Sequence, residues 1–239
     1  MDTTDLAIAT ITWARDEKEE ALLGESLTTL SRIGLPVFVT DGGSTSSYQD
    51  LVRNLPNVSF SQTKGLWAQA KNSITEAHRS GAKTILYTEP DKLQFFQHHL
   101  PQMLENSRWD EKSGVILATR SAKAFASFPA FQQMTETTIN RCCAEVTGFA
   151  TDYLYGPFLF TTDLLPHLDV LPETSGWGWR SFLFVKAHLL GYTLESWEGD
   201  YFCPPDQQSD DSVERIYRMK QLAQNIEGIV LATATHKTQ

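Results

Sequence analysis

The chain has 239 residues, of which 41% are hydrophobic and 21% charged, and its net charge is -9. This length suits one large α/β domain or two small ones, with enough apolar residues for a core. The acidic balance and the lack of a Lys/Arg cluster argue against nucleic-acid binding. No apolar run reaches the ~18 residues that a membrane-spanning helix needs. We therefore expect an acidic enzyme without a membrane span or a nucleic-acid partner.

The first half of the chain alternates strand and helix signals. Apolar, β-rich runs predict strands over residues 6–13, 37–40, 58–61 and 84–87, and helical periodicity predicts helices over 16–33 and 66–80. This order predicts an α/β fold with a mostly parallel sheet and right-handed crossovers. Ligands bind such sheets beyond the carboxyl ends of the strands, so the residues there are candidates for function.

The second half is less regular. Its signals predict strands over 114–119, 153–161 (after a turn) and 193–197, and helices over 131–146, 180–190 and 212–224. There is no internal repeat and no low-complexity linker. We therefore expect a single domain over residues 1–239, with the second half supplying the substrate side.

The cysteines are Cys142, Cys143 and Cys203, an odd number with an adjacent pair. This arrangement suits neither a disulfide framework nor a zinc site. We expect free thiols in a reducing cytoplasm.

Two carboxylates follow the strand predicted over 84–87, in Glu89-Pro90-Asp91. Carboxylate oxygens suit Mg²⁺ or Mn²⁺, which bridge to phosphate oxygens. The alternative is a strand-to-helix turn, in which Asp91 caps the amphipathic helix that follows. The spacing alone leaves both interpretations open.

Two glycine-containing turns lie at the other strand ends. In Asp41-Gly42-Gly43-Ser44 the acid can accept hydrogen bonds from a base or a ribose, or simply hold a turn. Lys64-Gly65 precedes a predicted helix, where N–H groups and the lysine can meet a phosphate. Further along, Gly176-Trp177-Gly178-Trp179 is either a loop whose indoles wall a pocket or a hydrophobic loop packed on the core.

Taken in order, these motifs resemble those of the GT-A-fold glycosyltransferases, which move a sugar from a nucleotide-sugar donor. The resemblance extends over about residues 6–200. It implies a mostly parallel sheet flanked by helices, with a nucleotide-binding half over about 1–113 and an acceptor half over about 114–239. It also implies a UDP- or GDP-sugar donor, a small-molecule or glycan acceptor, and Mg²⁺ or Mn²⁺ as cofactor. Within that fold, the motifs are most similar to those of the retaining enzymes that make glucosyl- or mannosyl-glycerate and its phosphate.

The resemblance also implies roles for individual residues. Donor binding falls to Arg15, Glu17, Asp41, Lys64, Gly65 and Lys71. The metal ligands are Glu89 and Asp91, with Asp206 as a further candidate. Acceptor binding falls to Arg120, Tyr155, Gly156, Trp177 and Trp179. Arg120 and Arg180 are candidates for bidentate binding of an acidic acceptor, with surface ion pairs as the alternative.

Three departures from the family pattern bear on catalysis. Glu89 replaces an aspartate of the metal motif, and the loop 201–211 lacks the later histidine that many relatives supply. Arg180 stands where inverting members place an acidic base, and Glu173 is the nearest upstream acid. Glu173 and Arg180 are therefore the catalytic candidates. Either the enzyme retains configuration and needs no base there, or its catalytic machinery has decayed.

Two other functions stay open. A sugar-nucleotide pyrophosphorylase needs a glycine-rich, basic loop after the first strand, and Trp13-Ala14-Arg15-Asp16-Glu17 has no glycine. A non-catalytic protein that keeps the fold and binds a nucleotide or a partner would tolerate the missing acid at position 180.

Overall fold

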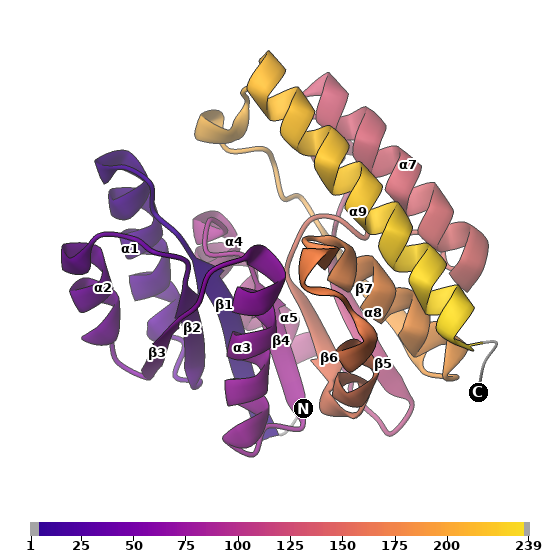
Figure 1. The fold of residues 1–239 in the computed structure, drawn as a ribbon, viewed down its shortest axis with the longest axis horizontal. Coiled ribbons are helices and arrows are strands. Elements are labelled where there is room, and N and C mark those ends of the chain that lie inside the picture. Colours follow the sequence, from indigo (N-terminus) through magenta and orange to yellow (C-terminus); the bar gives the residue numbers. More distant parts are fainter. Residues whose placement is uncertain (1–4, 237–239) are drawn as a thin grey trace. The chain divides into compact units, whose positions relative to one another are not determined.

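The computed structural model describes residues 5–236, which form two compact units (Figure 1). The first unit holds the residues up to Trp109 together with Pro157–Asp163. The second holds Asp110–Gly156 and the residues from Leu164 onward. The single-domain organisation with halves near residue 113 stays a prediction.

The first unit contains five strands that lie side by side in the order β3-β2-β1-β4-β6. Its strands are β1 (Leu6–Thr12), β2 (Val37–Asp41), β3 (Val58–Gln62), β4 (Thr84–Thr88) and β6 (Phe158–Thr161). The first four run parallel and β6 is antiparallel to β4. Almost every residue of β1, β2 and β4 is buried, which is typical of parallel strands covered on both faces.

Helices connect and cover these strands. They are α1 (Glu17–Ser31), α2 (Ser46–Arg53), α3 (Leu66–Arg79), α4 (Leu93–His98) and α5 (Leu100–Asn106). Asp16 caps α1 by accepting a hydrogen bond from the Glu19 N–H at 2.9 Å, and α3 packs against β1 and β2 (Figure 1). The expected strands and long helices of this half are present, so the mostly parallel α/β class is confirmed.

The sequence interpretation was wrong at two places in this unit. It did not predict α2, an eight-residue helix that begins after the Thr45 cap and buries only Tyr48 and Val52. It also offered, as one of two alternatives, Asp91 as the helix cap, but the N-cap of α4 is Lys92, whose side chain makes no capping hydrogen bond. Asp91 therefore lies one residue before the N-cap position.

The second unit combines two parallel strands with a group of helices. Its elements are β5 (Ser113–Arg120), α6 (Ala122–Phe125), α7 (Ala130–Thr147), η3 (Glu173–Ser175), α8 (Gly178–Leu189), β7 (Thr193–Gly199), η4 (Pro205–Gln207) and α9 (Ser212–His236). The 3₁₀ segment η2 (Thr162–Val170) runs from the first unit into the second along the chain. The core contains Tyr153, Trp179, Phe182 and Phe184, all nearly inaccessible.

Two boundaries in this unit differ from the sequence prediction. The helix α8 begins at Gly178 and includes Trp179, which the sequence placed in a loop. The last helix continues to His236 rather than ending near Gln224, because Gly228, Ile229 and Ala232 pack as its buried face.

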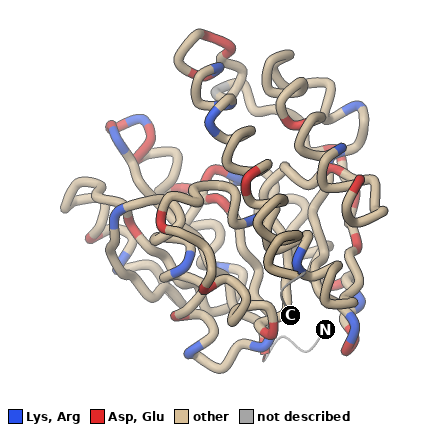
Figure 2. The backbone as a smooth tube through the Cα atoms, turned by 45° about the vertical axis from the view of Figure 1, so that its right-hand side comes forward, with Lys and Arg blue, Asp and Glu red and all other residues tan. Residues whose placement is uncertain are grey.

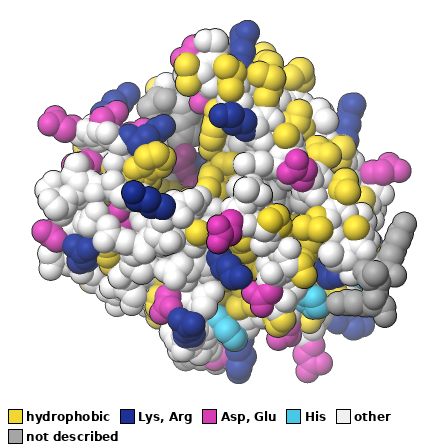
Figure 3. All heavy atoms as spheres, in the orientation of Figure 1, with side chains coloured by type: hydrophobic (Ala, Val, Ile, Leu, Met, Phe, Trp, Pro, Cys, Tyr) yellow, Lys and Arg dark blue, Asp and Glu magenta, His cyan; other side chains and the backbone are white. Residues whose placement is uncertain are grey.

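The surface charges are distributed along the whole described chain. Figure 2 shows basic and acidic residues interspersed, with no long basic stretch. Large apolar side chains of α9 lie at the surface, among them Val213, Ile216, Met219 and Val230 (Figure 3). No helix within residues 5–236 is both long and apolar enough to cross a membrane.

Candidate functional site

The carboxyl ends of β1, β2 and β4 meet at one edge of the first unit's sheet. Thr12 pairs with Asp41, and Thr10 pairs with Thr88, so the three strands end almost level. The segment Glu89–Asp91 follows directly. Because the strands are parallel, the loops after them share this edge, where ligands of such sheets bind.

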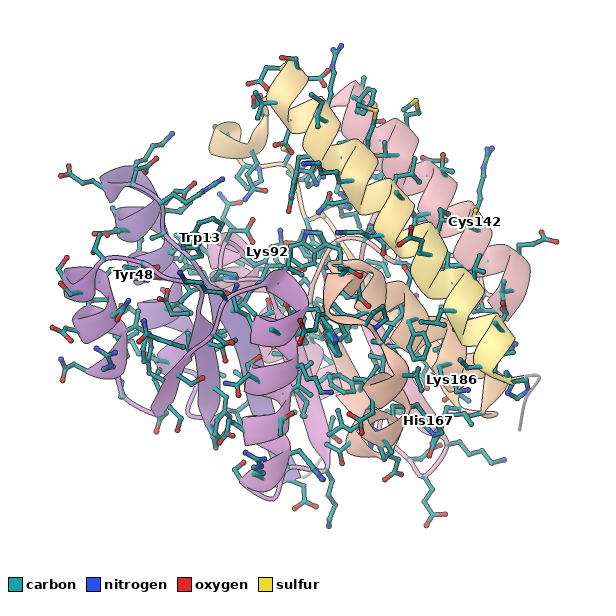
Figure 4. The ribbon with its side chains drawn as sticks, in the orientation of Figure 1. Trp13, Tyr48, Lys92, Cys142, His167 and Lys186 are labelled. Carbon is teal, nitrogen blue, oxygen red and sulfur yellow. The ribbon has the colours of Figure 1, made fainter. Side chains whose placement is uncertain are left out.

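The loop after β1 is held against the turn after β2. The Gly42 N–H donates to the Thr12 carbonyl at 2.8 Å, and the Ala14 N–H donates to Ser44 Oγ at 2.8 Å. Trp13 lies between these two anchored residues, yet its side chain is 55% exposed; Figure 4 labels it at the end of β1. Sequence reasoning did not name Trp13 as a site residue, although an aromatic directly after a buried strand was the signal.

Arg15 is exposed but ordered by Glu19. Its backbone N–H donates to Glu19 Oε2 at 2.8 Å and its guanidinium bonds to both carboxylate oxygens. The hydrogen bond from the Arg15 side chain is the main reason that the pKa of Glu19 is lowered. Glu17 is exposed in the first turn of α1. The donor-binding roles of Arg15 and Glu17 stay predictions.

Asp41 is completely buried and organises the turn that follows it. Its Oδ1 accepts from the N–H groups of Gly43 and Ser44 at 2.9 and 3.0 Å, and from Gln49 Nε2 at 3.3 Å. Its Oδ2 accepts from Ser44 Oγ at 2.5 Å. These hydrogen bonds are the ones that the turn interpretation of this motif predicts. A contact of Asp41 with a nucleoside stays a prediction.

Gly65 stands at the N-cap of α3 with φ of 98° and provides no side-chain cap. A residue with a Cβ is strained at such a φ, so glycine allows the chain to enter the helix there. The first N–H groups of α3 therefore meet no capping side chain from Gly65, which is the arrangement that favours anions. Lys64 and Lys71 are both exposed on either side of this helix start. Their contact with phosphates stays a prediction.

Glu89 and Asp91 are both partly exposed just beyond β4. Lys92 Nζ lies 3.3 Å from each carboxylate oxygen of Asp91. No group of three or more His, Cys, Asp or Glu side chains in the described residues forms a metal cage. Mg²⁺ is often held by only one or two carboxylates plus substrate phosphates and water. The pair Glu89 and Asp91 fits that mode of binding.

Arg120, predicted to bind an acceptor, is the centre of a buried ion cluster in the second unit. Its Nε and Nη2 donate to the two oxygens of Asp152 at 2.7 and 3.0 Å, and Nη2 also donates to Glu136 at 2.5 Å. Its side chain is only 1% exposed. The surface-pair alternative is therefore wrong, because the pairing is internal. An acceptor contact by Arg120 stays a prediction, and an acidic acceptor would have to compete with Glu136 and Asp152 for this guanidinium.

The pairing changes the pKa values of Arg120 and Asp152. Burial alone would raise the pKa of Asp152, but the charge and hydrogen bonds of Arg120, with the Leu154 N–H, outweigh it and lower this pKa. Burial would likewise lower the pKa of Arg120, and the charges of Glu136 and Asp152 raise it instead. Arg120 and Asp152 therefore both stay charged at neutral pH.

The Gly-Trp-Gly-Trp segment packs within the second unit. The Trp177 N–H donates to Gln224 Oε1 at 3.0 Å and its Nε1 donates to the Tyr217 hydroxyl at 2.8 Å. Trp179 is fully buried. These contacts agree with the core-packing interpretation, and acceptor contacts by the two indoles stay predictions.

The remaining candidates have different surroundings. Arg180 is buried with its Cζ 4.8 Å from the ring centre of Trp177, whereas Glu173 is exposed in η3. Tyr155 stacks on Tyr201 with ring centres 4.6 Å apart. Two other residues were predicted to belong to the site. Gly156 is buried with a φ of 135°, and Asp206 lies in η4, with its side chain outside the described part of the chain.

A groove of about 410 Å³ lies in the second unit beside the Arg120 cluster. Arg120 and Asp152 form part of its wall, together with Phe125, Thr137 and Arg141. Arg141 is exposed and has no ion pair within residues 5–236. It is therefore better placed than Arg120 to receive an anionic group.

Known proteins resemble this chain in structure, whereas its sequence matches none of those compared. No family model and no curated protein matches the sequence. Glucosyl-3-phosphoglycerate synthase from Mycobacterium tuberculosis, in complex with phosphoglyceric acid, matches 95% of this chain and 79% of its own at 13% identity and a TM-score of 0.60. The same enzyme with Mn²⁺, UDP and glucosyl-3-phosphoglycerate matches with the same coverage and identity and a TM-score of 0.57.

A further solved structure, described as a mycobacterial protein, matches 95% of this chain and 74% of its own at 15% identity and a TM-score of 0.60. At such low identity the likeness extends to the fold and not to individual residues. The chain therefore has the GT-A-type α/β fold that its motifs predicted, shared with glucosyl-3-phosphoglycerate synthase.

Proposed function

We propose that this protein is a metal-assisted glycosyltransferase that uses a nucleoside-diphosphate sugar as donor. The observation that carries the proposal is the position of Glu89 and Asp91 at the carboxyl edge of the sheet, level with the ends of β1 and β2. The fold supports it, since the similar synthase has been crystallised with Mn²⁺ and UDP-glucose. The N-cap position of α4 belongs to Lys92 and not to Asp91, which also favours the metal-site interpretation of Asp91.

The residues at this edge of the sheet each have a proposed role. Glu89 and Asp91 would hold Mg²⁺ or Mn²⁺. The bound ion neutralises the charge that develops on the departing nucleoside diphosphate. Lys64 and the start of α3 bind phosphate oxygens. Asp41 orders the turn after β2, and this turn is proposed to contact the nucleoside.

Trp13 is proposed to present its exposed indole to the nucleobase. Its neighbours on both sides are hydrogen-bonded to the turn after β2, so the backbone is already ordered before a ligand arrives. Stacking of a base on an aromatic ring contributes about 1–3 kcal/mol.

The acceptor is proposed to be acidic. The similar synthase binds phosphoglyceric acid, and in this chain Arg141 presents an exposed guanidinium at the groove of the second unit. Tyr155, Gly156 and the tryptophans of residues 177 and 179 stay candidates for shaping the acceptor side.

The proposed chemistry needs no base at position 180. The guanidinium of Arg180 stays protonated in proteins and cannot accept a proton from an acceptor hydroxyl. Arg180 is therefore proposed to act electrostatically, with Glu173 the candidate acid nearest along the chain. This combination favours retention of configuration at the sugar.

Calorimetry with UDP and GDP, each with and without Mn²⁺, tests the proposal directly. We expect one of the two nucleotides to bind, and to bind more tightly when Mn²⁺ is present. If neither binds under any of the four conditions, the proposed function is wrong.

A second candidate is a protein that keeps the donor site without catalysis, favoured by Arg180 at the position of the usual acid. Donor hydrolysis separates the two. A catalyst releases UDP from UDP-glucose faster than Asp91→Asn, whereas equal background rates in both proteins support the non-catalytic candidate.

A further inference from the structure

Asp91 already holds a positive charge from its own chain. The Lys92 ammonium lies 3.3 Å from both Asp91 oxygens, and the Lys92 side chain is only 14% exposed. Lysine is rarely this buried unless its charge is matched. The partner is a carboxylate that the proposed function assigns to a divalent cation.

Local helix stability does not explain a lysine at this position. Lys92 is the N-cap of α4, and its side chain makes no capping hydrogen bond. Lysine has no acceptor to offer at an N-cap, where Ser, Thr, Asp and Asn are preferred. The lysine is therefore placed for its charge.

The ammonium and a divalent cation compete for the same carboxylate. Two positive charges on one side of Asp91 repel each other, so a metal on this carboxylate disfavours the pair with Lys92. The side chain is long and flexible, and an ammonium released at this edge has a diphosphate as its natural acceptor.

We propose that Lys92 is the internal counter-ion of Asp91 and moves from this carboxylate to the donor diphosphate when the metal binds. This inference rests on the proposed function. It makes metal and nucleoside diphosphate bind cooperatively, because each favours the state with Lys92 away from Asp91, and such coupling is reciprocal. Metal alone then binds weakly, and the site fills when donor and metal are both present.

Lys92→Gln tests this with two binding measurements of opposite expected sign. Titration with Mn²⁺ alone, followed by electron paramagnetic resonance, is expected to give a Kd about fivefold lower than wild type, since the competing ion pair is gone. Calorimetry with UDP at saturating Mn²⁺ is expected to give a Kd about fivefold higher, since a phosphate contact is lost. Lys92→Arg keeps the charge and is expected to stay closer to wild type in both.

Lys220→Gln is the matched control, because it removes the same charge from an exposed position on α9. It is expected to change neither Kd. A thermal unfolding curve for each variant confirms that it is folded before titration.

The outcomes separate the inference from the proposed function. If wild type binds no nucleoside diphosphate with or without Mn²⁺, the proposed function and the inference both fall. If wild type binds both ligands and Lys92→Gln binds Mn²⁺ no tighter, the inference alone is overturned. If Lys92→Gln binds both Mn²⁺ and UDP more weakly, Lys92 has a structural role and the inference is also overturned. If the variant binds Mn²⁺ more tightly but its UDP affinity is unchanged, Lys92 does not move to the diphosphate.

Discussion

Gly178 and Gly228 lie against each other where α8 meets α9. A Cβ built at Gly228 would be 2.1 Å from the Gly178 carbonyl oxygen, and one built at Gly178 would be 2.1 Å from the Gln224 carbonyl oxygen. The obstructing atoms are backbone, so no side chain can move aside. This close approach explains why a glycine separates the two tryptophans of residues 177 and 179.

Gly178→Ala is expected to destabilise the protein. The added methyl group must push α8 and α9 apart, and such overpacking costs about 1–3 kcal/mol or more. Chemical denaturation measures the loss in the free energy of unfolding. Gly24→Ala in α1 is the matched control: its Cβ would lie 3.6 Å from a Leu51 methyl group, an ordinary contact. That variant is expected to be neutral or more stable by about 0.5–1 kcal/mol, and equal stability of Gly178→Ala and wild type would contradict the packing described.

Arg120→Met is expected to lower the free energy of unfolding by about 3–5 kcal/mol, because it leaves the buried Asp152 carboxylate without its cation and Glu136 with only Arg218, at 3.9 Å. Urea denaturation followed by circular dichroism gives the value. Arg79→Met removes an exposed pair with Glu76 on α3 and is expected to cost less than about 1 kcal/mol. Similar losses in the two variants would show that the Arg120 cluster contributes little.

The same cluster predicts a loss of stability in acid. The pKa of Asp152 is lower in the folded protein than the ~3.9 of an unfolded chain. Its contribution is therefore fully present above about pH 4 and is lost as the pH falls through the lower folded pKa. Denaturation midpoints measured from pH 6 down to pH 2 should fall more steeply for wild type than for Asp152→Asn, which has no carboxyl to protonate. Parallel curves would argue against the assignment.

Asp91→Asn is expected to weaken UDP binding in the presence of Mn²⁺ by about tenfold or more, since an amide is a poorer ligand for a hard cation than a carboxylate. Without Mn²⁺ no such weakening is expected. Calorimetry measures both conditions. Asp50→Asn, which makes the same charge change at an exposed site on α2, should bind like wild type. A Mn²⁺-dependent affinity that survives in Asp91→Asn would remove Asp91 from the metal site.

Trp13→Ala is expected to raise the Kd for UDP by about fivefold to a hundredfold, which corresponds to the loss of about 1–3 kcal/mol of base stacking. Trp13→Phe keeps an aromatic face and should lose much less. Inorganic pyrophosphate, which has no base, should bind both variants as it binds wild type. If pyrophosphate binding falls together with UDP binding, Trp13 acts on the loop and not on the base.

The sequence by itself determined the strands that build the first unit's sheet and the positions of their polar ends. Residues 6–12, 37–41 and 84–88 are rich in apolar residues and almost continuously buried, because both faces of a parallel strand are covered. Chain order then placed Asp41, Glu89 and Asp91 at carboxyl ends. The short helix α2 was missed because only Tyr48 and Val52 are buried in it, which is too few for a periodic signal.

Tertiary structure decided which partner each polar group meets. Arg120 reaches Glu136 and Asp152, 16 and 32 residues away, and Gly178 packs on a helix far along the chain. Asp41 accepts hydrogen bonds from the turn that follows it, and the N-cap of α4 is Lys92, not Asp91, for which the sequence left a capping role open. Propensity and periodicity depend on neighbours in the chain and can be read locally. The partner of a charge, and the space around a glycine, depend on which distant segments the fold brings together.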